Sequence, residues 1–196
     1  MSGTRLSVQD VCTLVSVARF ACRLDRESDI PVLYEYASKL RPGDTYLEIG
    51  TWMGCSAAVA ALASDSEAII WTVDSGAFHE SHWQHTPEEY RAILRANFAS
   101  CGVAEKIQIS LDGSLGTVCV RDIDLLFIDG DHSYKGISAD IAKWIPLVSP
   151  NGTVLFHDYA LYDGVKRAVD ELIEDGWQQL PGGENIYAVT RDEAIL

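Results

Sequence analysis

Residues 45–56 read Thr45-Tyr-Leu-Glu-Ile-Gly-Thr-Trp-Met-Gly-Cys-Ser56, an apolar run that ends on a glycine turn and leads into an alanine-rich segment. Helix-like segments separate most of the other apolar runs, and this strand–helix alternation predicts a parallel sheet with helices on both faces. We therefore expect an α/β fold with a Rossmann-like, doubly wound sheet. The other runs are residues 68–74, 106–113, 123–130 and 153–158.

An acidic residue lies at or near the end of each run. In such sheets, ligands bind outside the carboxyl ends of the strands, where the strand order reverses. A row of carboxylates there costs folding free energy unless a ligand, a cation or water meets it. Taken alone, each acid could instead be a helix cap or a turn residue. The acids are Glu48, Asp74, Asp112, Asp129 and Asp158.

The charge of the chain argues against a nucleic-acid partner. The 196 residues carry 15 basic and 29 acidic side chains, a net charge of −14, whereas nucleic-acid binding relies on clustered Lys and Arg. The first twenty residues make neither a signal peptide nor a membrane span. The five cysteines are odd in number and never spaced C-x-x-C, which favours reduced thiols in a cytoplasmic protein.

A single domain is expected over residues 1–196. Residues 1–40 predict two helices, one over about 7–23 and one that follows Pro31. These helices could cover the sheet, form a lid over the ligand site or contact a second copy in a homodimer. Residues 41–196 form the predicted cofactor-binding core, which ends in an antiparallel hairpin around Pro181-Gly-Gly183.

The glycine turn predicts a ligand without a pyrophosphate. Gly50 permits a positive φ or close approach of a ligand, and Gly54 keeps the next backbone accessible. Two glycines four residues apart do not make the G-x-G-x-x-G fingerprint. The pattern suits a ligand with a charged amino-acid end. Asp74, at the end of the next run, could accept both hydroxyls of a ribose.

The chain resembles the class I S-adenosylmethionine-dependent methyltransferases. More narrowly, it resembles a small bacterial group, similar to the macrocin and catechol O-methyltransferases, with an Asp-Gly-Asp-His loop and a later His-Asp pair. The resemblance covers roughly residues 40–190. It rests on Leu47-Glu-Ile-Gly-Thr-Trp-Met-Gly-Cys-Ser56, Thr72-Val-Asp74, Asp112-Gly-Ser114, Phe127-Ile-Asp-Gly-Asp-His-Ser-Tyr-Lys-Gly136 and Phe156-His-Asp-Tyr159.

This resemblance implies a seven-stranded sheet that ends in an antiparallel hairpin, with S-adenosylmethionine as cofactor. Glu48 and Gly50 are expected to line its methionine side, Asp74 to hold the ribose and the turn at 112–114 to border the adenine. The full expected cofactor-binding set is Glu48, Gly50, Thr51, Trp52, Gly54, Ser56, Asp74, Ser75, Asp112, Gly113, Ser114, Asp129 and His132.

A second cluster follows two strands expected to be neighbours. Asp129 and Asp158 would repel each other if unpaired, so a divalent cation between them resolves the conflict. Oxygen ligands favour Mg²⁺, Ca²⁺ or Mn²⁺, and similar methyltransferases bind Mg²⁺ with acids at matching strand ends. His157 is the third candidate ligand, where those relatives commonly have an acid or amide. In the alternative, Asp131 and Asp158 cap helices while Asp129 favours the sulfonium charge.

His132 and Asp129 are the candidate catalytic residues. An imidazole with a pKa of ~6.5 can take a hydroxyl proton near neutral pH. The alternatives are that His157 is the base, or that His132 is a loop histidine bonded to Asp131.

Three histidines at 79, 82 and 85 form an H-x-x-H-x-x-H run. The run could be a zinc site, plain surface or, as we favour, a pocket wall with Phe78 and Trp83. A spacing of three residues does not keep three side chains on one helix face.

The predicted function is S-adenosylmethionine-dependent O-methylation of a small hydroxylated acceptor, such as a sugar of a natural product or a phenol, with metal assistance. Two alternatives remain open. One is a metal enzyme of another class on the same fold, and the other is a catalytically silent S-adenosylmethionine-binding module. No nucleic acid and no membrane are expected as partners.

Overall fold

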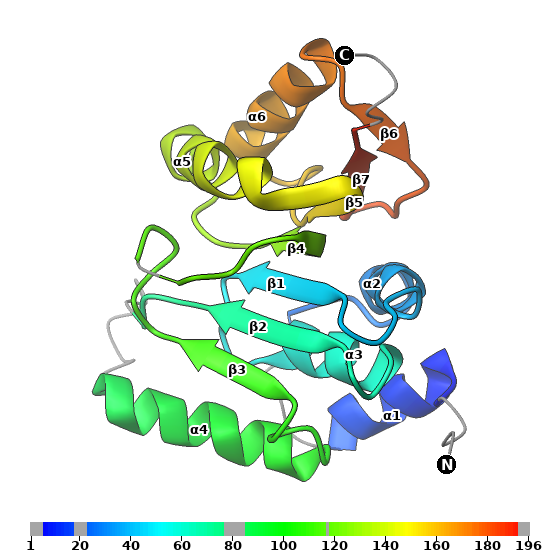
Figure 1. Ribbon diagram of the computed structural model, residues 1–196, viewed down its shortest axis with the longest axis vertical. Helices are drawn as coiled ribbons and strands as arrows, with labels where there is room; N and C mark the ends of the chain where they lie inside the picture. Colours follow the sequence, from blue (N-terminus) through cyan, green and yellow to red (C-terminus); the bar gives the residue numbers. More distant parts are fainter. Residues whose placement is uncertain (1–5, 18–22, 77–84, 117, 192–196) are drawn as a thin grey trace.

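A computed structural model describes residues 6–17, 23–76, 85–116 and 118–191 (Figure 1). One seven-stranded sheet has the order β3-β2-β1-β4-β5-β7-β6. Strands β1 to β5 are parallel, and β7 is antiparallel to both β5 and β6. The predicted sheet and its closing hairpin are confirmed. The strands are β1 (Thr45–Ile49), β2 (Ile69–Val73), β3 (Ile107–Ser110), β4 (Ile123–Ile128), β5 (Val148–Phe156), β6 (Gln178–Leu180) and β7 (Tyr187–Thr190).

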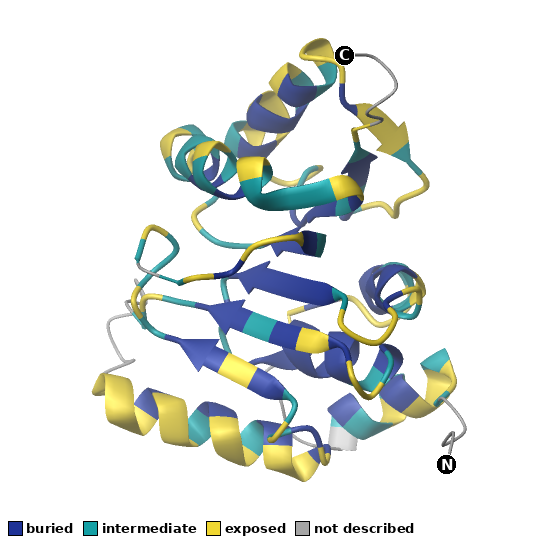
Figure 2. Cartoon of the chain, viewed as in Figure 1, coloured by how far each residue is buried: buried dark blue, intermediate teal, exposed yellow. Residues whose placement is uncertain are grey.

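Helices cover both faces because successive strand side chains point to opposite sides. Tyr46 and Phe127 pack with α1 to α4, whereas Leu47 and Ile128 pack with α5 and α6. The strands are largely buried, and the helices expose their outer faces (Figure 2). The helices are α1 (Val8–Val17), α2 (Asp29–Ala37), α3 (Cys55–Ala63), α4 (Pro87–Ser100), α5 (Tyr134–Trp144), the 3-10 helix η1 (Ile145–Leu147) and α6 (Asp163–Glu174).

Of the three uses foreseen for the N-terminal helices, the structure shows the first: α1 and α2 pack on α3 and help cover the sheet. Helix α2 starts before Pro31, not after it, because proline lacks only an N–H that the first helical turn does not need. The earlier start puts Asp29 at the first helical position. None of the described helices is long and apolar enough to span a membrane.

The cysteines depart from the expectation of reduced thiols. Cys55, at the start of α3, is disulfide-bonded, whereas Cys12, Cys101 and Cys119 are free. Spacing along the chain could not foresee this, because it does not reveal which residues the fold brings into contact.

Candidate active site

The glycine turn after β1 brings two strand ends together. Gly50 has a φ of +92°, and a Cβ there would overlap the carbonyl oxygen of Asp129 at the end of β4. Gly54 is the N-cap of α3 with a φ of +84°, and a Cβ there would overlap the ring of Phe98 in α4. Both positions therefore require glycine, and protein backbone fills the space beside Gly50.

Asp74 follows β2 and organises this turn. Its Oδ2 accepts hydrogen bonds from the backbone N–H groups of Thr51 at 2.8 Å and Trp52 at 3.2 Å. Its Oδ1 accepts one from the N–H of Gly76 at 2.6 Å. Trp52 has a φ of +44°, and its carbonyl accepts a hydrogen bond from the Tyr90 hydroxyl. The carboxylate thus fixes a backbone conformation that a non-glycine residue rarely adopts.

Glu48 lies beneath the turn and is fully buried. The hydroxyls of Tyr46 and Thr72 each donate to its carboxylate at 2.8 Å, and the Thr72 hydroxyl is also paired with that of Thr51. Burial raises the pKa of Glu48 to about 8. The hydroxyl donors, which include Ser56, have the opposite effect and lower this pKa, but burial outweighs them. Glu48 therefore supports the turn from inside the protein.

The turn after β3 lies beside the turn after β2. The N–H of Gly113 donates to the carbonyl of Asp74 at 3.0 Å, and a Cβ on Gly113 would touch Ser75. Lys143 of α5 holds the same loop by donating to the carbonyl of Ser114 at 2.8 Å. Asp112 is exposed next to them.

Burial divides the expected cofactor-binding residues into two groups. Buried side chains beneath the turn are Glu48, Thr51, Gly54 and Ser56. Residues at least partly accessible along the edge are Gly50, Trp52, Asp74, Ser75, Asp112, Gly113, Ser114, Asp129 and His132. The sheet brings the second group to one edge, because parallel strands end on the same side.

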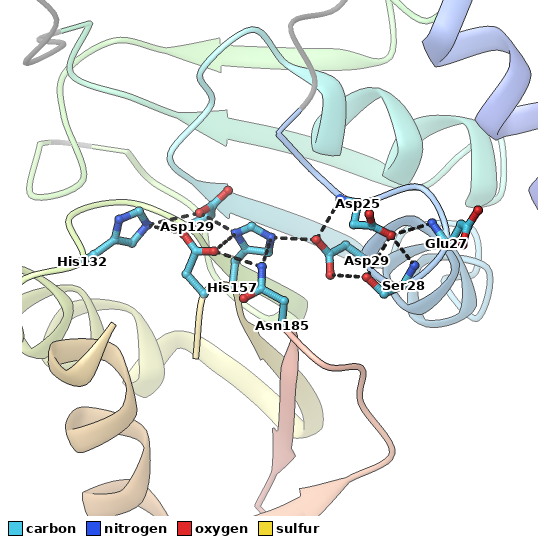
Figure 3. Close-up of polar contacts among 9 residues, drawn as sticks. Asp25, Glu27, Ser28, Asp29, Asp129, His132, His157 and Asn185 are labelled. Atoms are coloured by element: carbon cyan, nitrogen blue, oxygen red, sulfur yellow. Dashed lines mark hydrogen bonds and ion pairs between the residues drawn. The ribbon is translucent and has the colours of Figure 1, made fainter. Parts of the chain in front are cut away.

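A histidine–carboxylate cluster lies at the ends of β4 and β5 (Figure 3). His157 Nδ1 is 3.1 Å from Asp129 Oδ1 and 3.3 Å from Asp158 Oδ1. His132 Nε2 is 3.2 Å from Asp158 Oδ2 and 3.5 Å from Asp129 Oδ1. Asp158 has a φ of +60°, so the chain holds it in the left-handed region. The predicted proximity of Asp129 and Asp158 is confirmed.

The two histidines have different surroundings. Burial opposes the charged form of His157, but Asp129, Asp158 and Asp29 outweigh it and raise its pKa to about 12. The side chain is 4% exposed, so His157 is a buried imidazolium. Contact with Asp129 raises the pKa of His132 above its usual value, against the effect of burial.

The loop with His132 also meets the start of α6. The His132 ring stacks on the Tyr162 ring, with centroids 4.3 Å apart and planes 22° apart. A Cβ on Gly164 would overlap the carbonyl of His132 and the N–H of Tyr134. Glycine at this position therefore lets the first turn of α6 seat against the loop. Tyr162 remains 46% exposed beside the candidate base.

Three residues of this site were not identified from the sequence. Asp29 reaches His157 from α2, Asn185 donates to Asp158 Oδ1 at 3.0 Å from the loop before β7, and Tyr162 stacks on His132. No motif spans these distances along the chain. The predicted closing hairpin did not indicate that Asn185 would reach Asp158.

Most of the histidine run cannot be placed in the site. His79 and His82, with Phe78 and Trp83, lie outside the described residues. His85 lies just before α4, and its Nδ1 is 4.0 Å from a carboxylate oxygen of Glu89. Glu89 forms a capping box with Thr86 at the start of α4.

Known families account for this arrangement. The sequence profile of a methyltransferase domain family matches residues 47–159, more than half of the chain. The chain belongs to this methyltransferase family. The match runs from the glycine turn to the end of β5, so it includes both groups of strand-end acids.

One curated relative of this methyltransferase is the uncharacterized protein y4gI of Sinorhizobium fredii (strain NBRC 101917 / NGR234). The two are 30% identical over 115 residues, which are 57% of this chain and 13% of the relative. The chain thus matches only a small part of that longer protein.

Solved O-methyltransferases share the fold. NovP has a TM-score of 0.67 at 18% identity, with 84% of this chain and 79% of NovP covered. TomG from Streptomyces achromogenes, in complex with S-adenosylmethionine, has a TM-score of 0.63 at 17% identity, with 93% of this chain and 89% of TomG covered. The Bacillus cereus O-methyltransferase, in complex with SAH, has a TM-score of 0.61 at 15% identity, with 97% of this chain and 93% of that protein covered.

Proposed function

We propose that this methyltransferase transfers a methyl group from S-adenosylmethionine to a hydroxyl oxygen of a small molecule. The observation that carries the proposal is the cluster at the ends of β4 and β5. There, His132 Nε2 lies buried between two carboxylates, 3.2 Å from Asp158 Oδ2 and 3.5 Å from Asp129 Oδ1. A nitrogen in this position is available to an acceptor proton or to a cation.

The edge of the sheet fits the proposed cofactor. Trp52, Asp74 and the turn at 112–114 are partly accessible and adjacent, as binding at the carboxyl ends of the strands requires. We assign Asp74 to the ribose, the 112–114 turn to the adenine and the Gly50 turn to the methionine end. Glu48, which is buried, supports that turn and does not contact the ligand.

The charge of the cluster also fits a sulfonium cation. Three carboxylates, those of Asp29, Asp129 and Asp158, surround the single buried imidazolium of His157. The carboxylates therefore outnumber the cationic rings whether or not His132 is protonated. S-adenosylmethionine, when bound, supplies an already activated methyl group. The protein then has to orient the acceptor oxygen and take its proton.

A divalent cation fits a different set of residues from the expected one. Ligand atoms of Asp129, His132 and Asp158 all lie within 4.8 Å of one another. His157 is unsuitable because both of its nitrogens face carboxylates and its imidazolium has no free lone pair. A cation held by the other three would lower the acceptor pKa. His132 Nε2 cannot be both its ligand and the general base, so the two roles exclude each other.

The exposed ring of Tyr162 supports a ring-bearing acceptor, such as a phenol or a sugar. It lies on the His132 ring and can offer an apolar face to a second ring. The alternative of a non-methyltransferase metal enzyme built on His132, His157 and Asp129 is disfavoured, because His157 is unavailable as a ligand. A silent S-adenosylmethionine-binding module remains the competing function.

Calorimetry and a turnover assay test the proposal together. S-adenosylhomocysteine at 100 times its Kd should stabilise the protein by about 2.7 kcal/mol. A panel of phenols and sugars with S-adenosylmethionine should yield S-adenosylhomocysteine, with and without EDTA. Loss of turnover in EDTA, restored by Mg²⁺, assigns His132 to the metal; full turnover in EDTA assigns it to the proton. Absence of cofactor binding refutes the proposal, and binding without any turnover favours the silent module.

A further inference from the structure

Asp29 connects the N-terminal helix α2 to the histidine–carboxylate cluster (Figure 3). Its side chain is only 2% exposed, and its Oδ2 lies 3.2 Å from His157 Nε2. The two residues are 128 positions apart in the chain. A buried carboxylate is costly unless it is paired, so this contact requires a reason beyond chance packing.

The other end of the same imidazole faces the candidate active-site acids. His157 Nδ1 lies 3.1 Å from Asp129 Oδ1 and 3.3 Å from Asp158 Oδ1. The two nitrogens of an imidazole lie on opposite sides of a rigid ring, so a carboxylate that holds one nitrogen also sets the direction of the other. Asp29, together with Asn185, whose Nδ2 lies 3.1 Å from the same Nε2, therefore fixes where Nδ1 points.

We infer that Asp29 is a positioning residue for the active site, acting through His157 to hold Asp129 and Asp158 in place. The catalytic part of this inference rests on the proposed methyl transfer. It makes α2 part of the functional unit, although α2 precedes every matched methyltransferase motif in the chain. A carboxylate partner that orients a histidine, itself touching the reactive groups, is a common supporting arrangement.

A purely structural role for Asp29 would be to stabilise the start of α2, but Asp25 already does this. Asp25 Oδ1 accepts hydrogen bonds from the N–H groups of Glu27 at 2.8 Å and Ser28 at 2.9 Å. Asp29 Oδ2 also accepts one from the Asp25 N–H at 2.9 Å, so both acids order the turn. Of these two acids, Asp29 is the one paired with His157.

The test compares Asp29→Asn with the matched control Asp25→Asn in the full chain. Each change removes one carboxylate charge from the same turn. Histidine ring ¹⁵N chemical shifts, assigned with a His157→Gln sample, report hydrogen bonding at Nε2 without any need for turnover. We expect Asp29→Asn to shift the His157 signals and to lower kcat by about 10–100-fold for an acceptor that the wild-type protein methylates. The Kd for S-adenosylhomocysteine should stay nearly unchanged. Asp25→Asn should lower only the melting temperature.

Asp29→Glu keeps the charge on a longer side chain, so the His157 ring shifts and kcat should return part of the way to their wild-type values. This variant also provides a test if Asp29→Asn does not fold. Unshifted His157 signals in Asp29→Asn, or equal effects of both asparagine variants on ring shifts and kcat, would overturn the inference. If the signals shift but wild-type protein methylates no acceptor, the positioning contact stands and the proposed function fails.

Discussion

The two halves of the carboxyl edge of the sheet stabilise their acids by different means. On the β1–β2 side, Glu48 and Asp74 accept hydrogen bonds from hydroxyls and backbone N–H groups. On the β4–β5 side, Asp129 and Asp158 face the rings of His132 and His157. Neutral donors with fixed geometry hold a backbone conformation, whereas the imidazole of His132 is a group that can take up or release a proton.

This contrast suggests a division of work along one edge. The β1–β2 half is built to keep a turn in one conformation, which suits binding of the cofactor. The β4–β5 half concentrates charge that can move or be shared, which suits the chemistry. Four substitutions test this division, and each is expected to affect one half and spare the other.

His132→Ala should have the largest effect. A general base contributes about 10²–10⁴-fold, so kcat should fall by that factor while the Kd for S-adenosylhomocysteine stays nearly constant. Wild-type kcat should rise with pH, since the base must be deprotonated, and the rise should lie above pH 6.5 because Asp129 raises the pKa of His132. His157→Ala serves as the comparison. If His157→Ala loses kcat while His132→Ala keeps the wild-type kcat, His157 is the general base.

Glu48→Gln tests the buried support of the other half. Because the folded pKa is about 8 and the ordinary value is 4.5, the folded protein binds more protons than the unfolded chain between these values. The contribution of Glu48 to the free energy of unfolding should therefore fall by about 2.5 kcal/mol from pH 5 to pH 7. The wild-type-minus-variant difference in denaturant unfolding should show that slope. A pH-independent difference would mean that Glu48 stays ionised in the folded state.

Asp74→Ala should weaken cofactor binding. It removes the assigned ribose acceptor and the acceptor for the Thr51 and Trp52 N–H groups, so the affinity for S-adenosylmethionine should weaken by about 1.5–3 kcal/mol. Asp74→Asn, which keeps one acceptor oxygen, should lie between. Glu67→Ala removes an exposed acid before β2 and should leave calorimetric affinity unchanged. Equal affinity in a folded Asp74→Ala would refute the ribose assignment.

Tyr162→Ala should have the smallest effect, and only for ring-bearing acceptors. An aromatic contact contributes about 0.5–1.5 kcal/mol, so KM for a phenol should rise by about 2–12-fold with little change in kcat. Tyr162→Phe keeps the ring and should match wild type. If Tyr162→Phe raises KM as much as Tyr162→Ala does, the hydroxyl of Tyr162 matters and ring stacking does not. If neither variant raises KM, Tyr162 does not contact the acceptor.

The cluster at the ends of β4 and β5 shows how far sequence reasoning reached. The acid at the end of each run and the helix between runs predicted neighbouring strand ends, and Asp129 and Asp158 do meet. The sequence proposed His157 as the third metal ligand, whereas the structure brings His132 together with Asp129 and Asp158, because a sequence does not show which groups surround a ring. Asp29 and Asn185 occupy that ring from distant elements.

The sequence by itself determined the order of strands and helices, the glycine positions that a close turn needs and the edge where polar side chains collect. These features depend on local periodicity and backbone freedom, which a short stretch of chain already contains. Only the tertiary structure decided which acids are buried and which histidine is charged. Those properties depend on desolvation and on partners from far along the chain, such as Asp29 for His157, and appear only when the layers pack together.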